Sequence, residues 1–284
     1  MKICATIEEL QELLAPYRKQ KRSIGFVPTM GALHKGHLSL ISASRAENEV
    51  TVCSIFVNPT QFNNATDLER YPRTADDDKK LLAGAQCDIL FIPAVSEMYR
   101  SGDYSLIQDD FGALNKVMEG KSRPGHFAGM LTIVNKLFAA VMPDKAYFGE
   151  KDYQQLALVK QFVARHHIPV TVIACPIVRE EGGLAMSSRN RLLSSEEKKH
   201  AVKISQALFM VKAQWGARPV SELKQMVKEI FANDTFLKLD YFEIVNSFTL
   251  AELHDPDAVN EPAVACIAAY CDTVRLIDNV LLQE

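Results

Sequence analysis

The sequence lacks the features that mark several classes of protein. No stretch of its 284 residues approaches the run of about twenty apolar residues that a membrane span requires. The N-terminal segment, MKICATIEEL, lacks the apolar centre of a secretory signal. No long block of Lys and Arg is present, and the formal net charge is -3 at pH 7. We therefore expect a cytoplasmic protein without membrane or nucleic-acid partners.

The six cysteines do not form the spacing of a metal site or a disulfide framework. No CxxC pair is present, and most of the cysteines lie in apolar, strand-like runs: Cys53, Cys87, Cys175 and Cys266. Such positions are typical of reduced, buried thiols. The sequence predicts neither a zinc ribbon nor a disulfide-stapled fold.

What the sequence does contain is an alternation of apolar strands and amphipathic helices. A capping box at Thr6–Glu9 predicts a first helix. Apolar runs then predict strands near 23–27, 50–57, 87–92, 145–148 and 169–178, with helices between them. Strands that are almost continuously apolar indicate a parallel sheet with helices on both faces, which is a doubly wound, Rossmann-like α/β fold.

Some details of this first region follow from single residues. Pro28 has no N–H group, and we expect it to stop the pairing of the first strand. Residues 104–108 are expected to form a short strand, and residues 122–125 a turn. Apolar residues from His126 onward trace one face of a helix that Pro143 should end.

The pattern changes after residue 178. A capping box at Ser194–Glu197 and an apolar face at 223–231 predict two helices, and three strand-like runs follow at 239–245, 263–270 and 274–282. Helices followed by consecutive strands form an α+β domain. We expect a Rossmann-like domain at 1–178 and a smaller α+β domain at 179–284.

The segment FVPTMGALHKGH, residues 26–37, has the pattern of a strand, a turn and a helix. Gly31 permits a tight reversal, and Gly36 lets another group approach the helix backbone. A helix that starts near Lys35 presents free N–H groups and a positive dipole end, which favour phosphate. His34 and His37 are three residues apart, so one helical turn places both imidazoles on one side, where they can bind the phosphates of a nucleotide.

Two other interpretations of this histidine pair stay open. Histidines at this spacing can ligate zinc, although no third ligand stands nearby in a recognisable zinc pattern. They can also be two surface histidines at the start of a helix.

Two later motifs carry groups that bind phosphate. In GEKDYQQ, residues 149–155, Lys151 lies at another strand-to-helix turn, where its ammonium can reach phosphates. The alternative is an ordinary helix start capped by Asp152. In MSSRN, residues 186–190, two hydroxyls and a guanidinium can clamp a polyphosphate, and the alternative is a plain linker between the domains.

HKGH followed downstream by MSSR resembles the HxGH and KMSKS-type signatures of the nucleotidyltransferase superfamily. The chain also resembles one family within it, the pantoate–β-alanine ligases, over essentially its whole length. Seven segments carry that resemblance in order: VPTMGALHKGH, SIFVNPTQF, RYPRT, SRPGHF, FGEKDYQQL, GLAMSSRN and RLIDN. The sequence departs from the usual family pattern at Lys35, where an acidic residue is common, and at Gly182, where Asp-Gly is frequent.

The resemblance implies an ATP-dependent ligase. A carboxylate and an ammonium do not condense at neutral pH, so pantoate first attacks the α-phosphorus of ATP to give pantoyl adenylate and pyrophosphate. β-Alanine then displaces AMP, which yields pantothenate. The resemblance further implies a homodimer and Mg²⁺ bound through the ATP phosphates, without protein ligands for the metal.

The same resemblance assigns roles to residues of this sequence. The catalytic residues are His34, His37, Lys151 and Arg189. ATP-binding residues are Met30, Gly31, Ala32, Leu33, His34, Lys35, Gly36, His37, Gly149, Glu150, Lys151, Asp152, Val178, Met186, Ser187, Ser188 and Arg189. Gln61 and Gln155 are expected to bind pantoate, and Gln61 also β-alanine. Asn58, Tyr71 and Arg123 are expected at the substrate entrance.

Two rival functions share part of this pattern. A cytidylyl- or adenylyltransferase that acts on a phosphorylated acceptor would also carry HxGH and a downstream clamp. A non-catalytic nucleotide sensor could use the same scaffold without turnover. A small tRNA synthetase is disfavoured because nothing resembles an anticodon-binding domain or a basic face for tRNA.

Overall fold

The computed structural model describes residues 1–255 and 260–283, and the chain forms two compact units. The first consists of Met1–Phe111, Gly120–Glu150 and Gln155–Pro176, and the second of Gly112–Glu119, Lys151–Gln154 and Ile177–Glu284. The two short segments that join the second unit were not set apart in the sequence.

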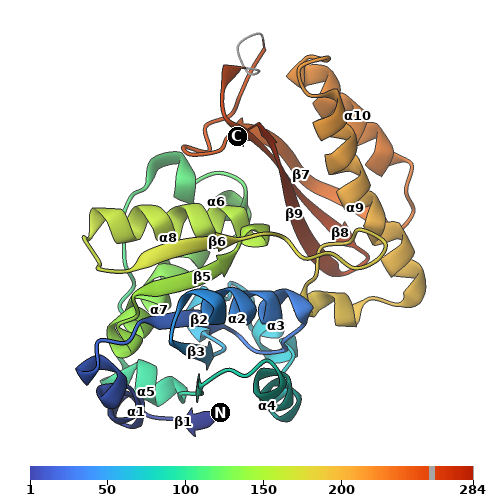
Figure 1. The fold of residues 1–284 in the computed structure, drawn as a ribbon. Coiled ribbons are helices and arrows are strands. Elements are labelled where there is room, and N and C mark those ends of the chain that lie inside the picture. Colours follow the sequence, from blue (N-terminus) through green and yellow to red (C-terminus); the bar gives the residue numbers. More distant parts are fainter. Residues whose placement is uncertain (256–259, 284) are drawn as a thin grey trace. The chain divides into compact units, whose positions relative to one another are not determined.

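The first unit is built on a six-stranded parallel sheet with the order β1–β4–β3–β2–β5–β6 (Figure 1). Its strands are β1 Lys2–Cys4, β2 Ile24–Thr29, β3 Val50–Ile55, β4 Ile89–Phe91, β5 Lys145–Gly149 and β6 Thr171–Cys175. The predicted parallel α/β fold is confirmed. Strand β3 is buried along its whole length and is paired on both sides, as its unbroken apolar run indicated.

Helices flank this sheet. They are α1 Ile7–Lys19, α2 Lys35–Glu47, α3 Ala65–Arg70, α4 Ala75–Gly84, α5 Val95–Met98, α6 Glu119–Ser122, α7 His126–Val141 and α8 Tyr153–Arg165. Neighbouring side chains of β2 show which helices cover which face, because successive residues of a strand point to opposite sides. The Phe26 ring packs edge-on against Phe138 of α7, whereas Val27 belongs to the buried cluster that includes Ile41 of α2. Helices α7 and α2 therefore cover opposite faces.

Three details differ from the expectations. Pro28 does not end the pairing of β2, because Pro28 lies opposite Ser54 and Thr29 opposite Ile55. A proline removes one N–H donor, but the neighbouring carbonyls can still accept, and the Phe56 N–H donates to the Thr29 carbonyl at 3.0 Å.

Residues 104–108 form no strand. Their backbone is tied instead to α7, where the Ile107 N–H donates to the Thr132 hydroxyl at 2.9 Å. Strand β1 was not expected, because it is only three residues long and depends on its pairing with β4.

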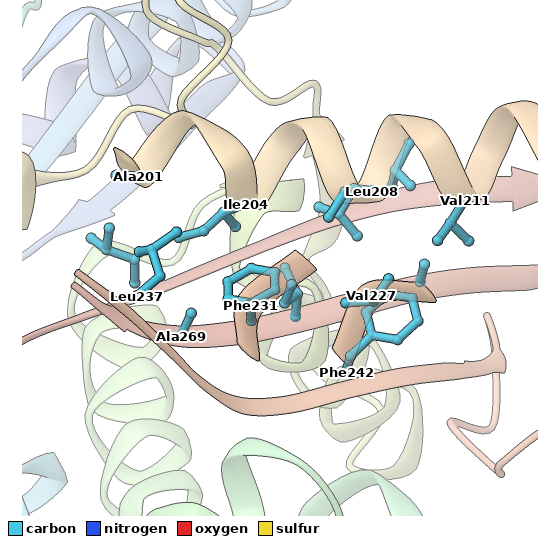
Figure 2. Close-up of a cluster of buried hydrophobic side chains, with 14 of the residues drawn as sticks. Ala201, Ile204, Leu208, Val211, Val227, Phe231, Leu237, Phe242 and Ala269 are labelled. Atoms are coloured by element: carbon cyan, nitrogen blue, oxygen red, sulfur yellow. The ribbon is translucent and has the colours of Figure 1, made fainter. Parts of the chain in front are cut away.

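The second unit is a three-stranded antiparallel sheet with the order β7–β8–β9, covered by two helices. The elements are α9 Ser195–Gln214, α10 Val220–Ala232, β7 Leu237–Asn246, β8 Ala263–Cys271 and β9 Val274–Gln283. Figure 2 shows Ile204, Leu208 and Val211 of α9 directed at side chains of α10 and the sheet, among them Phe231 and Phe242. The predicted α+β arrangement is confirmed. Among the residues that the structure describes, no helix is long and apolar enough to cross a membrane.

Candidate active site

The connection order of the first unit reverses between β2 and β5. From β2 the chain continues to β3 and β4 on one side, and later to β5 and β6 on the other. Open α/β sheets bind ligands beyond the carboxyl ends of the strands at such a switch point. The turn Met30–Leu33 follows β2 and Glu150 follows β5, so both lie at this edge of the sheet.

The predicted helix start at Lys35 is confirmed, with His34 as its N-cap. His34 Nδ1 accepts the Gly36 N–H at 3.2 Å, and the His37 N–H donates to the His34 carbonyl at 2.8 Å. The centroids of the two imidazole rings are 4.1 Å apart and their planes meet at 39°. The rings therefore lie side by side over the first turn of α2, as their spacing predicted. Because His34 Nδ1 accepts a hydrogen bond, a neutral His34 carries its ring proton on Nε2.

The turn before the histidines has an unusual backbone. Gly31 and Ala32 have φ angles of 82° and 50°, in the left-handed region. A Cβ at Gly31 would lie 3.0 Å from a methyl group of Ile55, so both the conformation and the space favour glycine here. The Gly31 N–H donates to the Thr29 hydroxyl at 3.2 Å.

A buried aspartate of α4 contacts the same turn. Asp78 is only 1% exposed. Its two carboxylate oxygens accept hydrogen bonds from the N–H groups of Ala32 at 2.9 Å and Leu33 at 2.7 Å. The Thr74 hydroxyl donates to it at 3.2 Å. No signal in the sequence pointed to this role for Asp78, because it is the last of three consecutive aspartates at the start of a helix, where solvent-exposed acids are common.

Gln61 lies beside this turn. Its side-chain amide donates to the Met30 sulfur at 3.1 Å, and its side-chain oxygen accepts the Asn58 amide at 3.2 Å. The backbone carbonyl of Gln61 accepts from His126 Nδ1 at 2.8 Å, and Arg123 donates to the other nitrogen of that ring at 3.1 Å. The structure thus places Gln61 against Met30, in the turn that leads to HxGH, and holds it from two sides.

Asn58 has no exposed surface, so it does not stand at a substrate entrance in this structure. Its amide donates to the Gly129 carbonyl at 3.1 Å, and its oxygen accepts from the Tyr99 hydroxyl at 2.7 Å. Burial raises the pKa of Tyr99, which keeps the phenol protonated as a donor. The Asn58 side chain supports Gln61 rather than facing solvent. Of the other two residues expected at the entrance, Tyr71 is buried and packs edge-on against Phe62, whereas Arg123 is half-buried.

In the second unit, strand β9 holds two of the predicted segments. The Asn279 amide donates to the Lys151 carbonyl at 2.9 Å. Asp278 accepts two hydrogen bonds from the Arg179 guanidinium, at 2.6 and 3.0 Å. The Met186 N–H donates to the Val178 carbonyl at 2.9 Å, which places the start of the Ser-Ser-Arg segment beside the strand-like residues around Arg179. Asp278 and Asn279 belong to the RLIDN segment, one of the seven that carry the family resemblance. That resemblance was the sequence signal that could have pointed to their contacts with Arg179 and Lys151.

The Ser-Ser-Arg segment is ordered by local contacts. Ser187 caps a short 3₁₀ helix, Ser188–Leu192, and its hydroxyl accepts the Arg189 N–H at 3.3 Å. Asn190 is 3% exposed and donates to Glu180 at 2.8 Å and to the Ala185 carbonyl at 3.0 Å. These contacts make the segment a defined turn rather than a plain linker.

The predicted site residues fall into two groups, one in each unit. The first unit carries Met30, Gly31, Ala32, Leu33, His34, Lys35, Gly36, His37, Gln61, Gly149, Glu150 and Gln155. The second carries Lys151, Asp152, Val178, Met186, Ser187, Ser188 and Arg189. The convergence of the two groups on one nucleotide stays a prediction. Among the residues described, no cluster of three or more His, Cys, Asp or Glu side chains is arranged to hold a metal ion.

The fold and this turn define an open α/β protein with an HxGH turn at the switch point of its sheet. The particular family follows from comparison with known proteins. Residues 2–281 match the model of the pantoate-beta-alanine ligase family, and the chain belongs to that family.

Similar proteins match the chain over its full length. The pantothenate synthetase of Bacteroides fragilis is 48% identical over 284 residues, which is 100% of both chains. The crystal structure of pantothenate synthetase from Thermus thermophilus has a TM-score of 0.93 and 41% identity, and covers 100% of both chains. The pantoate-beta-alanine ligase from Francisella tularensis, solved in complex with beta-gamma ATP and beta-alanine, has a TM-score of 0.82 and 39% identity, with 99% of this chain and 98% of that chain covered.

The ion pair between Arg179 and Asp278 generates a stability prediction. Their side chains are only 18% and 2% exposed, so removal of one partner leaves a poorly solvated charge. We expect Asp278→Asn to lower the free energy of unfolding by about 3–5 kcal/mol. Arg179→Met combined with Asp278→Asn should cost less than the sum of the two single changes, by about 1–3 kcal/mol. Urea unfolding of the three variants measures this coupling.

A matched control is the exposed pair of Arg218 and Glu222, whose side chains are 49% and 54% exposed. Glu222→Gln should change the stability by less than about 1 kcal/mol. Additive losses in the Arg179–Asp278 cycle would show that the pair does not anchor this segment.

Proposed function

We propose that this protein condenses (R)-pantoate with β-alanine in an ATP-dependent reaction that forms pantothenate and releases AMP and pyrophosphate through a pantoyl adenylate. The observation that carries the proposal is the close pair of His34 and His37 rings at the N-terminus of α2, with the Gln61 amide beside the turn that precedes them. Membership in the pantoate-beta-alanine ligase family supports the substrates.

The first step transfers AMP from ATP to the pantoate carboxylate. Negative charge grows on the departing pyrophosphate, and donors that are already oriented stabilise it without reorganisation. His34 Nε2–H and His37 supply such donors, and the positive dipole end of α2 favours negative charge at the same place. Met30, Gly31, Ala32, Leu33, Lys35 and Gly36 complete this side of the nucleotide site.

Gln61 and Gln155 are proposed to bind pantoate, and Gln61 also β-alanine. A carboxamide offers both a donor and an acceptor, so it can pair with a hydroxyl and a carboxylate. Gln61 is 7% exposed and fixed by Asn58 and Met30. A substrate without the hydroxyl would leave the second N–H or the second lone pair of this amide unused in a buried site, which is a strong basis for rejection.

The second group of residues, together with Gly149 and Glu150 of the first, is proposed to bind the phosphates and the adenosine. Lys151, Ser187, Ser188 and Arg189 would neutralise charge on the triphosphate. Gly149, Glu150, Asp152, Val178 and Met186 would line the nucleotide. In this proposal residues 1–178 bind ATP and pantoate, and residues 179–284 carry the clamp. Mg²⁺ would be held through the phosphate oxygens and would offset their charge.

The complex of the Francisella tularensis ligase with beta-gamma ATP and beta-alanine supports ATP and β-alanine as substrates. A cytoplasmic location and a homodimer complete the proposal. The first rests on the absence of a secretory pattern in the sequence, and the second on the family resemblance.

The test is ATP–pyrophosphate exchange with radioactive pyrophosphate. The proposed ligase should show exchange that requires pantoate and Mg²⁺, needs no phosphorylated acceptor, and is abolished by EDTA. Exchange that requires a phosphorylated acceptor would favour the other nucleotidyltransferases. ATP binding without exchange under any of these conditions would favour a nucleotide sensor.

His37→Ala should lower the rate of adenylate formation about 100- to 1,000-fold, because one oriented donor is removed.

The control for His37→Ala is His167→Asn, which changes an exposed histidine of the same unit. Both variants should keep their melting temperature within a few degrees of the wild type. Equal losses of stability and activity in His37→Ala would mark a structural histidine instead.

Gln61→Ala should raise the KM for pantoate about 10- to 100-fold, because a hydrogen bond to a charged group is lost. Steady-state kinetics with varied pantoate at saturating ATP measures this. Gln225→Ala, an exposed glutamine on α10, should leave the pantoate requirement unchanged. The same outcome in Gln61→Ala would remove Gln61 from the pantoate site.

A further inference from the structure

Asp78 is a buried carboxylate that the proposed chemistry does not use. Burial of a carboxylate is costly unless its oxygens are hydrogen-bonded. In the part of the chain that the structure describes, the hydrogen bonds to Asp78 come from neutral groups: the Ala32 and Leu33 N–H groups and the Thr74 hydroxyl. The burial of this carboxylate against the Ala32–Leu33 turn indicates that it serves to fix the geometry of that turn.

The turn needs such a constraint. Ala32 has a φ of 50°, a backbone conformation that residues other than glycine rarely adopt unless their surroundings impose it. The two oxygens of Asp78 bind two consecutive N–H groups, which fixes the orientation of both peptide planes. Leu33 directly precedes His34, and His34 Nδ1 is in turn tied to the Gly36 N–H. The chain of contacts therefore runs from Asp78 through the turn to the imidazole pair.

The neighbouring aspartates show that a negative charge at the start of α4 does not by itself lead to contact with the turn, and that the position of Asp78 on the helix does. Asp76 and Asp77 are exposed, and they pair with Lys79 at 3.2 Å and Lys80 at 3.6 Å. The helical phase of α4 directs only Asp78 toward the turn.

We propose that Asp78 is a positioning residue that orients His34 and His37 for the phosphates by fixing the Ala32–Leu33 backbone. Its relevance to catalysis rests on the proposed function. The carboxylate touches no reacting atom in this role, since it acts through the turn.

Asp78→Asn is the sharpest test, because the amide keeps the size of the side chain but replaces one acceptor with a donor. One of the two backbone N–H groups then faces an N–H instead of an oxygen, and the turn must shift. A displacement of about 1 Å at a catalytic group can cost about 100-fold in rate, so we expect adenylate formation per folded molecule to fall about 10- to 100-fold. Asp77→Asn, the same chemical change one residue earlier, should stay within about 2-fold of the wild type.

The second readout is independent of activity. In ¹⁵N-edited NMR of the histidine rings, wild type and Asp77→Asn should show a His34 Nδ1 that accepts a hydrogen bond, and Asp78→Asn should shift the His34 and His37 ring resonances. Thr74→Val removes the hydroxyl donor and keeps the carboxylate. It should move the same resonances less, and it serves as the test if Asp78→Asn does not fold.

Histidine resonances that stay unchanged in Asp78→Asn or, if that variant does not fold, in Thr74→Val would overturn the positioning role. So would Asp78→Asn activity that falls only in proportion to the folded fraction. A wild-type protein without pantoate-dependent exchange would contradict the proposed function alone, because the NMR comparison still decides whether Asp78 orients the histidines.

Discussion

The parallel pairing of β2 with β3 is the constraint on which the site in the first unit depends. The register places Thr29 opposite Ile55, so both strands deliver their following turns to the same edge of the sheet. The histidine turn follows one strand and the turn with Gln61 follows the other. The two turns therefore meet where the Gln61 side-chain amide donates to the Met30 sulfur at 3.1 Å.

Each of these turns is then held by an element from elsewhere in the chain. Helix α7 comes so close to the Gln61 turn that a Cβ at Gly129 would lie 2.3 Å from the Thr60 carbonyl oxygen. Helix α4 brings Asp78 under the histidine turn. In the second unit β9 plays the corresponding part for Lys151 and for the residues that lead to Ser187. The groups proposed to bind substrates thus lie on turns, and regular elements supply their rigidity.

Much of the fold was predictable because its signals are local. Both capping boxes, at Thr6 and Ser194, start helices as expected. The helix from His126 ends at Val141, just before Pro143. The failures were cases in which a contact with a distant segment decides the outcome. Strand β1 forms only by pairing with β4. Residues 104–108 are hydrogen-bonded to α7 instead of forming a strand. The pairing of β2 continues past Pro28 because β3 is adjacent.

By itself the sequence determined the order of the helices and strands, the family through its ordered motifs, and the pairing of His34 with His37, because these depend on spacings of a few residues. Only the tertiary structure decided which of three aspartates is buried, that Tyr99 and the Gly129 carbonyl hold Asn58, and that Asn279 holds Lys151. The residues in these contacts are up to 128 positions apart, and no local periodicity encodes such a contact. It exists only after the sheets have formed and the helices have packed on them.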